Sequence, residues 1–161
     1  MVHNTYGSVI ASNMIEECQG WAIVLDKDCY GTTISANVIA HEFTGGIDLR
    51  DAHGCAVSAN TFTIVKKCGI AVRESSGSIT ISGNNFSDSW ISTDGGREIS
   101  KRGDSATKSE ENPNEAAGIL LESCEAVVIT GNLFSRLSGE PVVKKGNCRE
   151  VLLQANGAHL R

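Results

Sequence analysis

The stretch that decides the fold is residues 117–134, which reads AGILLESCEAVVITGNLF. It opens with a Gly-Ile-x-Leu segment and closes on Asn132, which follows a glycine and precedes a phenylalanine by two residues. Apolar residues recur at every second position in two short runs, a pattern that predicts β-strands. Because strands this short are not stable alone, the segment predicts one layer of a stacked, repeating structure.

The end of this segment recurs along the whole chain. Asparagine stands at positions 13, 37, 60, 84, 132 and 156, with spacings of 24, 23, 24, 48 and 24 residues. The residue three places before each asparagine is apolar, and the residue directly before it is Ala, Gly or Ser. Self-similarity at a fixed period is the signature of a solenoid. The sequence therefore predicts an all-β solenoid of about six coils of 23–24 residues, each with three short strands.

The doubled spacing of 48 residues locates an insertion. The next strand should open 10 residues after Asn84, but its isoleucine, Ile119, comes 35 residues later. About 25 extra residues therefore separate two strands of one coil. We expect a single domain over residues 1–161, with a loop insertion at 90–115 within the fourth coil.

The recurring asparagine predicts an Asn ladder at one corner of the coils. Asparagine tolerates the left-handed backbone of a sharp bend, and its amide can bond to the next asparagine along the stack. Cys124 and Cys148 each precede a ladder asparagine by eight residues, so we expect them to be stacked. The six cysteines include no Cys-x-x-Cys pair, which favours free thiols over disulfides or a metal site.

Composition narrows the classes of partner. The net charge of −5 offers no basic face for nucleic acid, and no apolar run approaches the roughly 18 residues of a membrane span. The first residues do not form a signal peptide, so localisation stays open, with a secreted or cell-surface parent protein as the expectation. Both ends of the chain fall within a coil, which predicts a fragment of a longer solenoid or end-to-end self-association.

The Gly-Ile-x-Leu and Ile-x-Gly-Asn-x-Phe motifs of residues 117–134, with looser copies on the other coils, resemble the right-handed parallel β-helix of the pectate-lyase-like superfamily. The resemblance covers nearly the whole chain. It implies that ligands, usually acidic polysaccharides, lie along the outer face of the Gly-Ile-x-Leu strands. The Arg-Pro-x-x-Arg motif of pectate lyases and the full polygalacturonase-like set are missing from the sequence. Whether the chain is an enzyme stays open; if it is one, we expect a polysaccharide lyase or a glycoside hydrolase.

Charged residues recur on the outer face of these strands. Three residues after each strand-opening position stand Asp26, Arg50, Arg73, Glu122 and Lys145. Arg50 and Arg73 could hold sugar carboxylates, with Glu122 and Lys145 extending the binding face. Asp48 and Asp26 are the candidate catalytic pair, because strand geometry places their backbones about 8 Å apart, as in an inverting glycosidase. The alternative is a solvated face on which opposite charges pair across strands.

No metal or cofactor is predicted, with one alternative. Asp26, Asp28, Asp48 and Asp51 could supply oxygen ligands to calcium. Two functions follow from the sequence. The first is a β-helix module of a carbohydrate-active protein that binds or processes an acidic polysaccharide. The second is a non-catalytic β-helix scaffold or assembly module.

Overall fold

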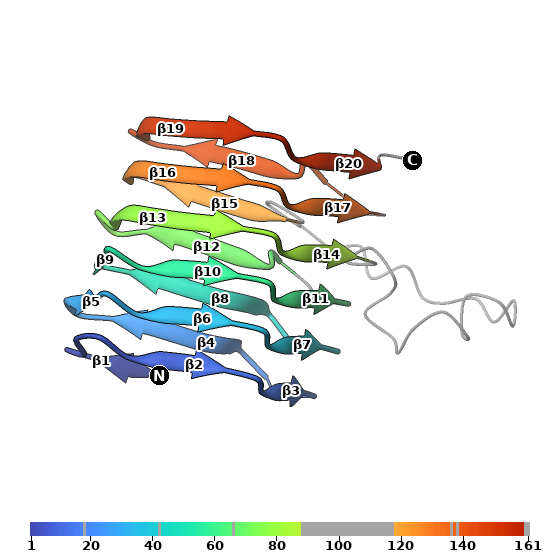
Figure 1. The fold of residues 1–161 in the computed structure, drawn as a ribbon, viewed down its shortest axis with the longest axis horizontal. Coiled ribbons are helices and arrows are strands. Elements are labelled where there is room, and N and C mark those ends of the chain that lie inside the picture. Colours follow the sequence, from blue (N-terminus) through green and yellow to red (C-terminus); the bar gives the residue numbers. More distant parts are fainter. Residues whose placement is uncertain are drawn as a thin grey trace, which may run out of the picture.

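A computed structural model shows a parallel β-helix in which three sheets run along the stack of coils (Figure 1). The structure describes residues 1–17, 19–41, 43–65, 67–87, 118–135, 137 and 139–159. These residues form strands and turns, with no helix among them. The described part of the chain therefore has no helix that could span a membrane. The predicted all-β solenoid is confirmed.

Sheet A is formed by the first strand of each coil. Its members are β1 (Val2–His3), β4 (Trp21–Asp26), β8 (Gly45–Arg50), β12 (Ile70–Arg73), β15 (Ile119–Glu122) and β18 (Val142–Lys145). They are the predicted Gly-Ile-x-Leu strands and their counterparts, and each pairs in parallel with the equivalent strand of the next coil.

Sheets B and C are formed by the second and third strands. Sheet B contains β2 (Val9–Ala11), β6 (Thr33–Ser35), β10 (Ala56–Ser58), β13 (Gly77–Ser82), β16 (Glu125–Thr130) and β19 (Arg149–Gln154), with the short β5 (Cys29–Tyr30) and β9 (Ala52–His53) beside them. Sheet C contains β3 (Met14–Glu16), β7 (Val38–Ala40), β11 (Thr61–Thr63), β14 (Asn85–Ser87), β17 (Leu133–Ser135) and β20 (Gly157–His159).

The register follows the repeat. Ile70 of β12 pairs with Ile119 of β15, so the strands before and after the doubled spacing belong to adjacent coils. The predicted insertion at 90–115 lies outside the described residues. Because every coil brings equivalent residues into line, positions that match in sequence are neighbours in space.

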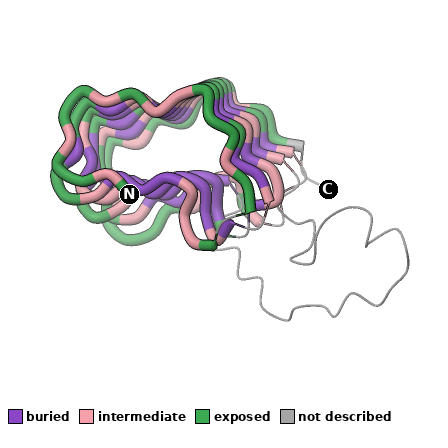
Figure 2. Tube along the Cα trace, turned by 90° about the horizontal axis from the view of Figure 1, so that it is seen from below, coloured by how far each residue is buried: buried purple, intermediate pink, exposed green. Residues whose placement is uncertain are grey.

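The core consists of inward columns that recur from coil to coil, as the view along the stack shows (Figure 2). Phe62, Phe86 and Phe134 stack with ring centroids 4.8 and 4.9 Å apart. Each ring lies against the glycine that precedes the strand-opening isoleucine of sheet A; a Cβ on Gly69 would fall 2.5 Å from the Phe86 ring. The glycine of the Gly-Ile-x-Leu motif therefore makes room for a core aromatic ring.

The Asn ladder is confirmed, and its four middle members, Asn37, Asn60, Asn84 and Asn132, are buried. The backbone N–H and the side-chain Nδ2 of Asn60 both donate to Oδ1 of Asn84, each at 3.0 Å, and Nδ2 also donates to the Ile34 carbonyl. One detail differs from the prediction. The left-handed backbone belongs to the residue before each asparagine, for example Ala59 with φ of 54° and Gly83 with φ of 62°. Small residues precede the asparagines because this position bends the chain.

The five described cysteines are free, as predicted. Four of them, Cys29, Cys55, Cys68 and Cys124, are buried, and Cys148 is half-buried. Cys18 lies outside the described residues. Cys29, Cys55 and Cys124 act as small core side chains, and Cys148 packs against the same core.

Candidate functional site

The outer face of sheet A carries the predicted charged column. Arg73 pairs in register with Arg50 on one side and with Glu122 on the other, and Glu122 pairs with Lys145. Asp26 ends β4 at the equivalent position. The sequence repeat thus located all five members of the column, which the coils bring into one row.

Asp48 is the centre of this face. It is fully buried, and both of its carboxylate oxygens accept hydrogen bonds from arginines. Arg50 Nε donates to Oδ2 at 2.6 Å, and Arg73 binds both oxygens, with Nε 2.7 Å from Oδ1. We call this set of three residues the arginine clamp. Burial of a charge is costly unless it is paired and hydrogen-bonded, and the two arginines supply both.

The two guanidinium groups keep contact with solvent. The side chains of Arg50 and Arg73 are 25% and 24% exposed, while that of Asp48 is 0% exposed. Hydrogen bonding to Asp48 raises the pKa of the Arg73 guanidinium, against the opposing effect of its partial burial. Two positive charges and one negative charge leave a net positive charge of one on the clamp.

An apolar patch adjoins the clamp on the same face. The Arg73 guanidinium carbon lies 5.4 Å from the ring centroid of Trp21, a cation–π contact. Trp21 packs on a cluster of buried outward residues, Cys68, Ala71 and Leu120. The ring lies over Gly45, where a Cβ would come within 2.4 Å of a ring carbon. A glycine at position 45 leaves room for the indole beside Arg73.

Asp26 has different neighbours from Asp48. Its Oδ2 lies 3.8 Å from Nε2 of His3, on the neighbouring strand β1. The described structure therefore brings Asp48 together with Arg50 and Arg73, and places Asp26 beside a histidine. That the two carboxylates act as a catalytic pair stays a prediction.

Asp28 and Asp51, two of the aspartates that could bind calcium, also have hydrogen-bond partners of their own. Tyr6 donates to Asp28 at 2.6 Å, and the backbone N–H of Asp28 donates to Asp51. The hydrogen bond from Tyr6 to Asp28 raises the pKa of the tyrosine hydroxyl. Across the described ranges, no three His, Cys, Asp or Glu side chains gather as metal ligands would.

A column of thiols and one hydroxyl follows sheet A on the inside. Cys29, Ser76 and Cys148 hold equivalent positions, and each donates to the carbonyl three residues earlier and to the carbonyl 27 residues earlier, on the previous coil. Cys124 belongs to the same column. Burial first, and then the neighbouring Cys148, raises the pKa of Cys124 to about 12. Cys124 is therefore protonated at neutral pH.

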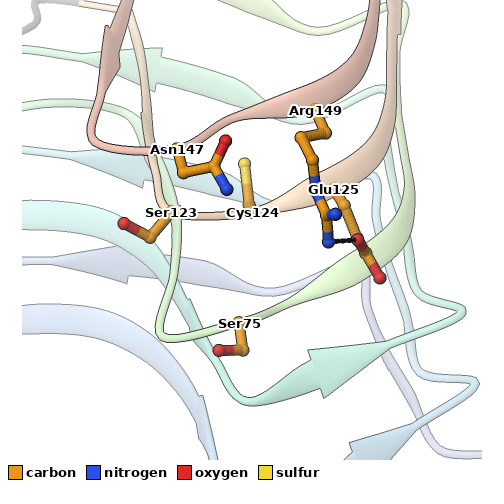
Figure 3. A pocket seen from close by; sticks show the side chains of 6 residues that line it. All are labelled: Ser75, Ser123, Cys124, Glu125, Asn147 and Arg149. Atoms are coloured by element: carbon orange, nitrogen blue, oxygen red, sulfur yellow. Dashed lines mark hydrogen bonds and ion pairs between the residues drawn. The ribbon is translucent and has the colours of Figure 1, made fainter.

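A pocket of about 220 Å³ opens at the turns between sheets A and B. We call it the corner pocket; Figure 3 shows its lining residues, which are Ser75, Ser123, Cys124, Glu125, Asn147 and Arg149. Arg149 donates to the Glu125 carboxylate across one side of it. The sequence reasoning did not predict this pocket, although its turn residues recur nine positions before a ladder asparagine.

The pattern of the whole chain matches one protein family. A family model described as "Periplasmic copper-binding protein (NosD)" matches residues 1–156. The chain belongs to the NosD family. A search of curated proteins found no match. The predicted β-helix is thus confirmed by both the structure and the NosD family, whereas the link to the pectate-lyase-like superfamily stays a prediction.

The name of the NosD family raises the question of copper, and the described residues do not fit a copper site. Cu(I) prefers thiolate ligands, and metal binding requires their deprotonation. Cys124 and Cys148 are adjacent, but Cys148 donates to two backbone carbonyls and the pKa of Cys124 is about 12. A thiolate at Cys148 would face the carbonyl oxygens of Leu121 and Lys145.

Proposed function

We propose that this chain is a non-catalytic β-helix module that binds an acidic polysaccharide along the outer face of sheet A. The observation that supports it is the arginine clamp. Asp48 fixes the guanidinium groups of Arg50 and Arg73 on neighbouring coils, at the surface of a rigid sheet. A preorganised pair of arginines suits the planar carboxylate of a uronic acid.

The charge and geometry of the clamp favour an anion. Both arginines contact the Asp48 carboxylate through Nε and Nη2. Nη1 of each arginine makes no bond to Asp48. The net positive charge of the three clamp residues favours a carboxylate at these remaining N–H groups, against the negative charges of Glu74 and Glu122, which also act on Arg73. Trp21 offers an apolar ring next to them, as sugar-binding faces often require.

The environment of Asp48 supports binding rather than catalysis. A general acid or base must reach the substrate and exchange a proton with it. Asp48 is fully buried, and both oxygens are bound by arginines. In this proposal Asp48 is a positioning residue for Arg50 and Arg73. Glu122 and Lys145 continue the face toward β18.

The NosD description also bears on location and copper. Its word "periplasmic" agrees with the expectation of an exported parent protein, and we include a periplasmic location in the proposal. Copper binding is left out of it, because the described thiols do not fit that role.

The proposal can be tested by affinity electrophoresis in gels that contain alginate or polygalacturonate. Arg50→Gln should weaken retardation by roughly tenfold in apparent Kd, the loss of one strong charge-assisted hydrogen bond. Lys27→Gln removes the same charge from an exposed turn and should leave retardation unchanged. Equal mobility of wild type in gels with and without polysaccharide would disprove the binding function. Release of reducing ends or unsaturated uronates by the wild type would disprove its non-catalytic part.

A further inference from the structure

The corner pocket is built from the same turn of three successive coils. Ser75, Ser123 and Asn147 each stand nine residues before a ladder asparagine. Stacking brings Ser75 against Ser123, and on the third coil Gly146 lies against Ser123, with Asn147 directly after it. Their backbones are tied together: the Ser75 N–H donates to the Ser123 carbonyl, and the Ser123 N–H donates to the Lys145 carbonyl. The backbone of the turn is therefore satisfied by the stack itself.

The side chains of these three residues remain available. Among the described residues, none makes a hydrogen bond with the side chains of Ser75, Ser123 or Asn147, and all three are exposed. Figure 3 shows them on one side of the pocket, with Glu125 and Arg149 on the other. Five polar side chains of both donor and acceptor type thus line a single hollow.

The chemistry of the lining indicates a neutral, hydroxyl-rich ligand. Glu125 and Arg149 cancel each other's charge, so the pocket has no excess charge with which to select a carboxylate. Two hydroxyls, one amide, one carboxylate and one guanidinium can donate to and accept from sugar hydroxyls. At about 220 Å³, the pocket is smaller than the roughly 300–1,000 Å³ clefts of drug-sized ligands, and its size suits one sugar ring.

The corner pocket is continuous with the charged column. Ser75 follows Arg73 by two residues, Ser123 directly follows Glu122, and Asn147 follows Lys145 by two. We propose that the corner pocket is a sugar-binding subsite that holds a ring of the polysaccharide through its hydroxyl groups, while the arginine clamp holds a carboxylate farther along. This inference rests on the proposed polysaccharide-binding function.

The test is NMR titration of the chain with two small probes, methyl galactoside and methyl galacturonoside. Both probes should shift the backbone amide signals of Ser75, Ser123 and Asn147. Their Kd values should be similar, because the pocket has no excess charge that would select the carboxylate. Asn147→Ala should weaken both by roughly fivefold, about one hydrogen bond. Asn4→Ala is the matched control, because Asn4 holds the same turn position on the first coil.

The outcomes separate the two proposals. Both proposals are supported if the Arg50→Gln variant keeps the amide shifts caused by the small probes but is no longer retarded by the polymer. If wild type shows the shifts but no retardation by polymer, the clamp proposal fails and the subsite stands. If the three amides do not shift, or if Asn147→Ala and Asn4→Ala weaken binding equally, the subsite is disproved whatever the clamp does.

Discussion

Ser76 and Cys148 hold the same position in two different coils and make the same pair of contacts. Each side chain donates to the carbonyl three residues earlier and to the carbonyl 27 residues earlier. A hydroxyl and a thiol thus do the same structural work, which is to join the turn after sheet A to the previous coil.

This equivalence predicts the effect of substitutions at Cys148. Cys148→Ser should change the free energy of unfolding by less than about 0.5 kcal/mol, since the donor is kept. Ser76→Ala should cost about 1–3 kcal/mol, because the buried hydroxyl also accepts from the Ala52 N–H, which would be left unsatisfied. Urea unfolding measures both values. A larger loss in Cys148→Ser than in Cys148→Ala would contradict the shared role.

Cys124 should be unreactive at ordinary alkaline pH. Its pKa is raised from about 9 to about 12, and the thiolate is the reactive form. Alkylation by iodoacetamide at pH 9 should therefore be much slower in the folded chain than in urea. Because the folded pKa exceeds the unfolded one, the stability that this thiol contributes is complete below about pH 9 and is lost toward pH 12. Cys124→Ser should lack that alkaline loss, and rapid alkylation of native Cys124 at pH 8 would argue against the raised pKa.

The surroundings of Cys124 and Cys148 predict the response to copper. Replacing both Cys124 and Cys148 by serine should leave the affinity for Cu(I) unchanged at pH 7, because Cys124 keeps its proton at that pH and Cys148 donates to two backbone carbonyls. Competition with a colorimetric Cu(I) chelator measures the affinity. If the double variant loses a stoichiometric Cu(I) site that wild type has, these thiols are copper ligands after all.

The fold was predictable because the period of the sequence repeat sets the register in which successive coils stack. Asn60 and Phe62 recur at a fixed period, and the structure stacks each on its sequence equivalent. The arginine clamp was predictable in part. The repeat places Asp48 between apolar neighbours, with Asp26 diagonally on one coil and Arg73 on the other, but it gives backbone positions and not side-chain directions. It therefore did not predict that both Arg50 and Arg73 turn to one carboxylate.

The different partners of Asp26 and Asp48 have the same origin. Strand geometry fixes the distance between two backbones, while the direction of each side chain depends on local partners. Asp48 faces two arginines in a buried setting, and Asp26 faces His3 near the end of the stack. The corner pocket was missed because serine and asparagine at turns are ordinarily explained by backbone bending alone.

The buried clamp predicts a large loss in Asp48→Ala. Removing one partner of a buried ion network leaves uncompensated charge, and the partial exposure of Arg50 and Arg73 lets them regain some solvent. We expect a loss of about 2–4 kcal/mol in urea unfolding. Glu125→Ala is the control, because its ion pair with Arg149 is more than half exposed on both sides and should contribute less than about 1 kcal/mol. Similar losses in the two variants would show that burial of Asp48 is of little consequence.

The Asn ladder predicts a position-dependent cost along the stack. Asn84 is 1% exposed, and its Oδ1 accepts from both the backbone N–H and the Nδ2 of Asn60. Asn84→Ala leaves these two buried donors without an acceptor, so the loss should be about 2–4 kcal/mol. Asn13→Ala changes the exposed first rung. It removes donors whose acceptors stay bonded to other groups or to water, so it should cost about 1 kcal/mol or less.

Asn84→Asp should lose more stability at pH 7 than at pH 4, because its carboxylate would face Oδ1 of Asn132, which is also an acceptor. Urea unfolding at both pH values measures these differences, and equal losses at the first and fourth rungs would refute a ladder that stabilises through burial.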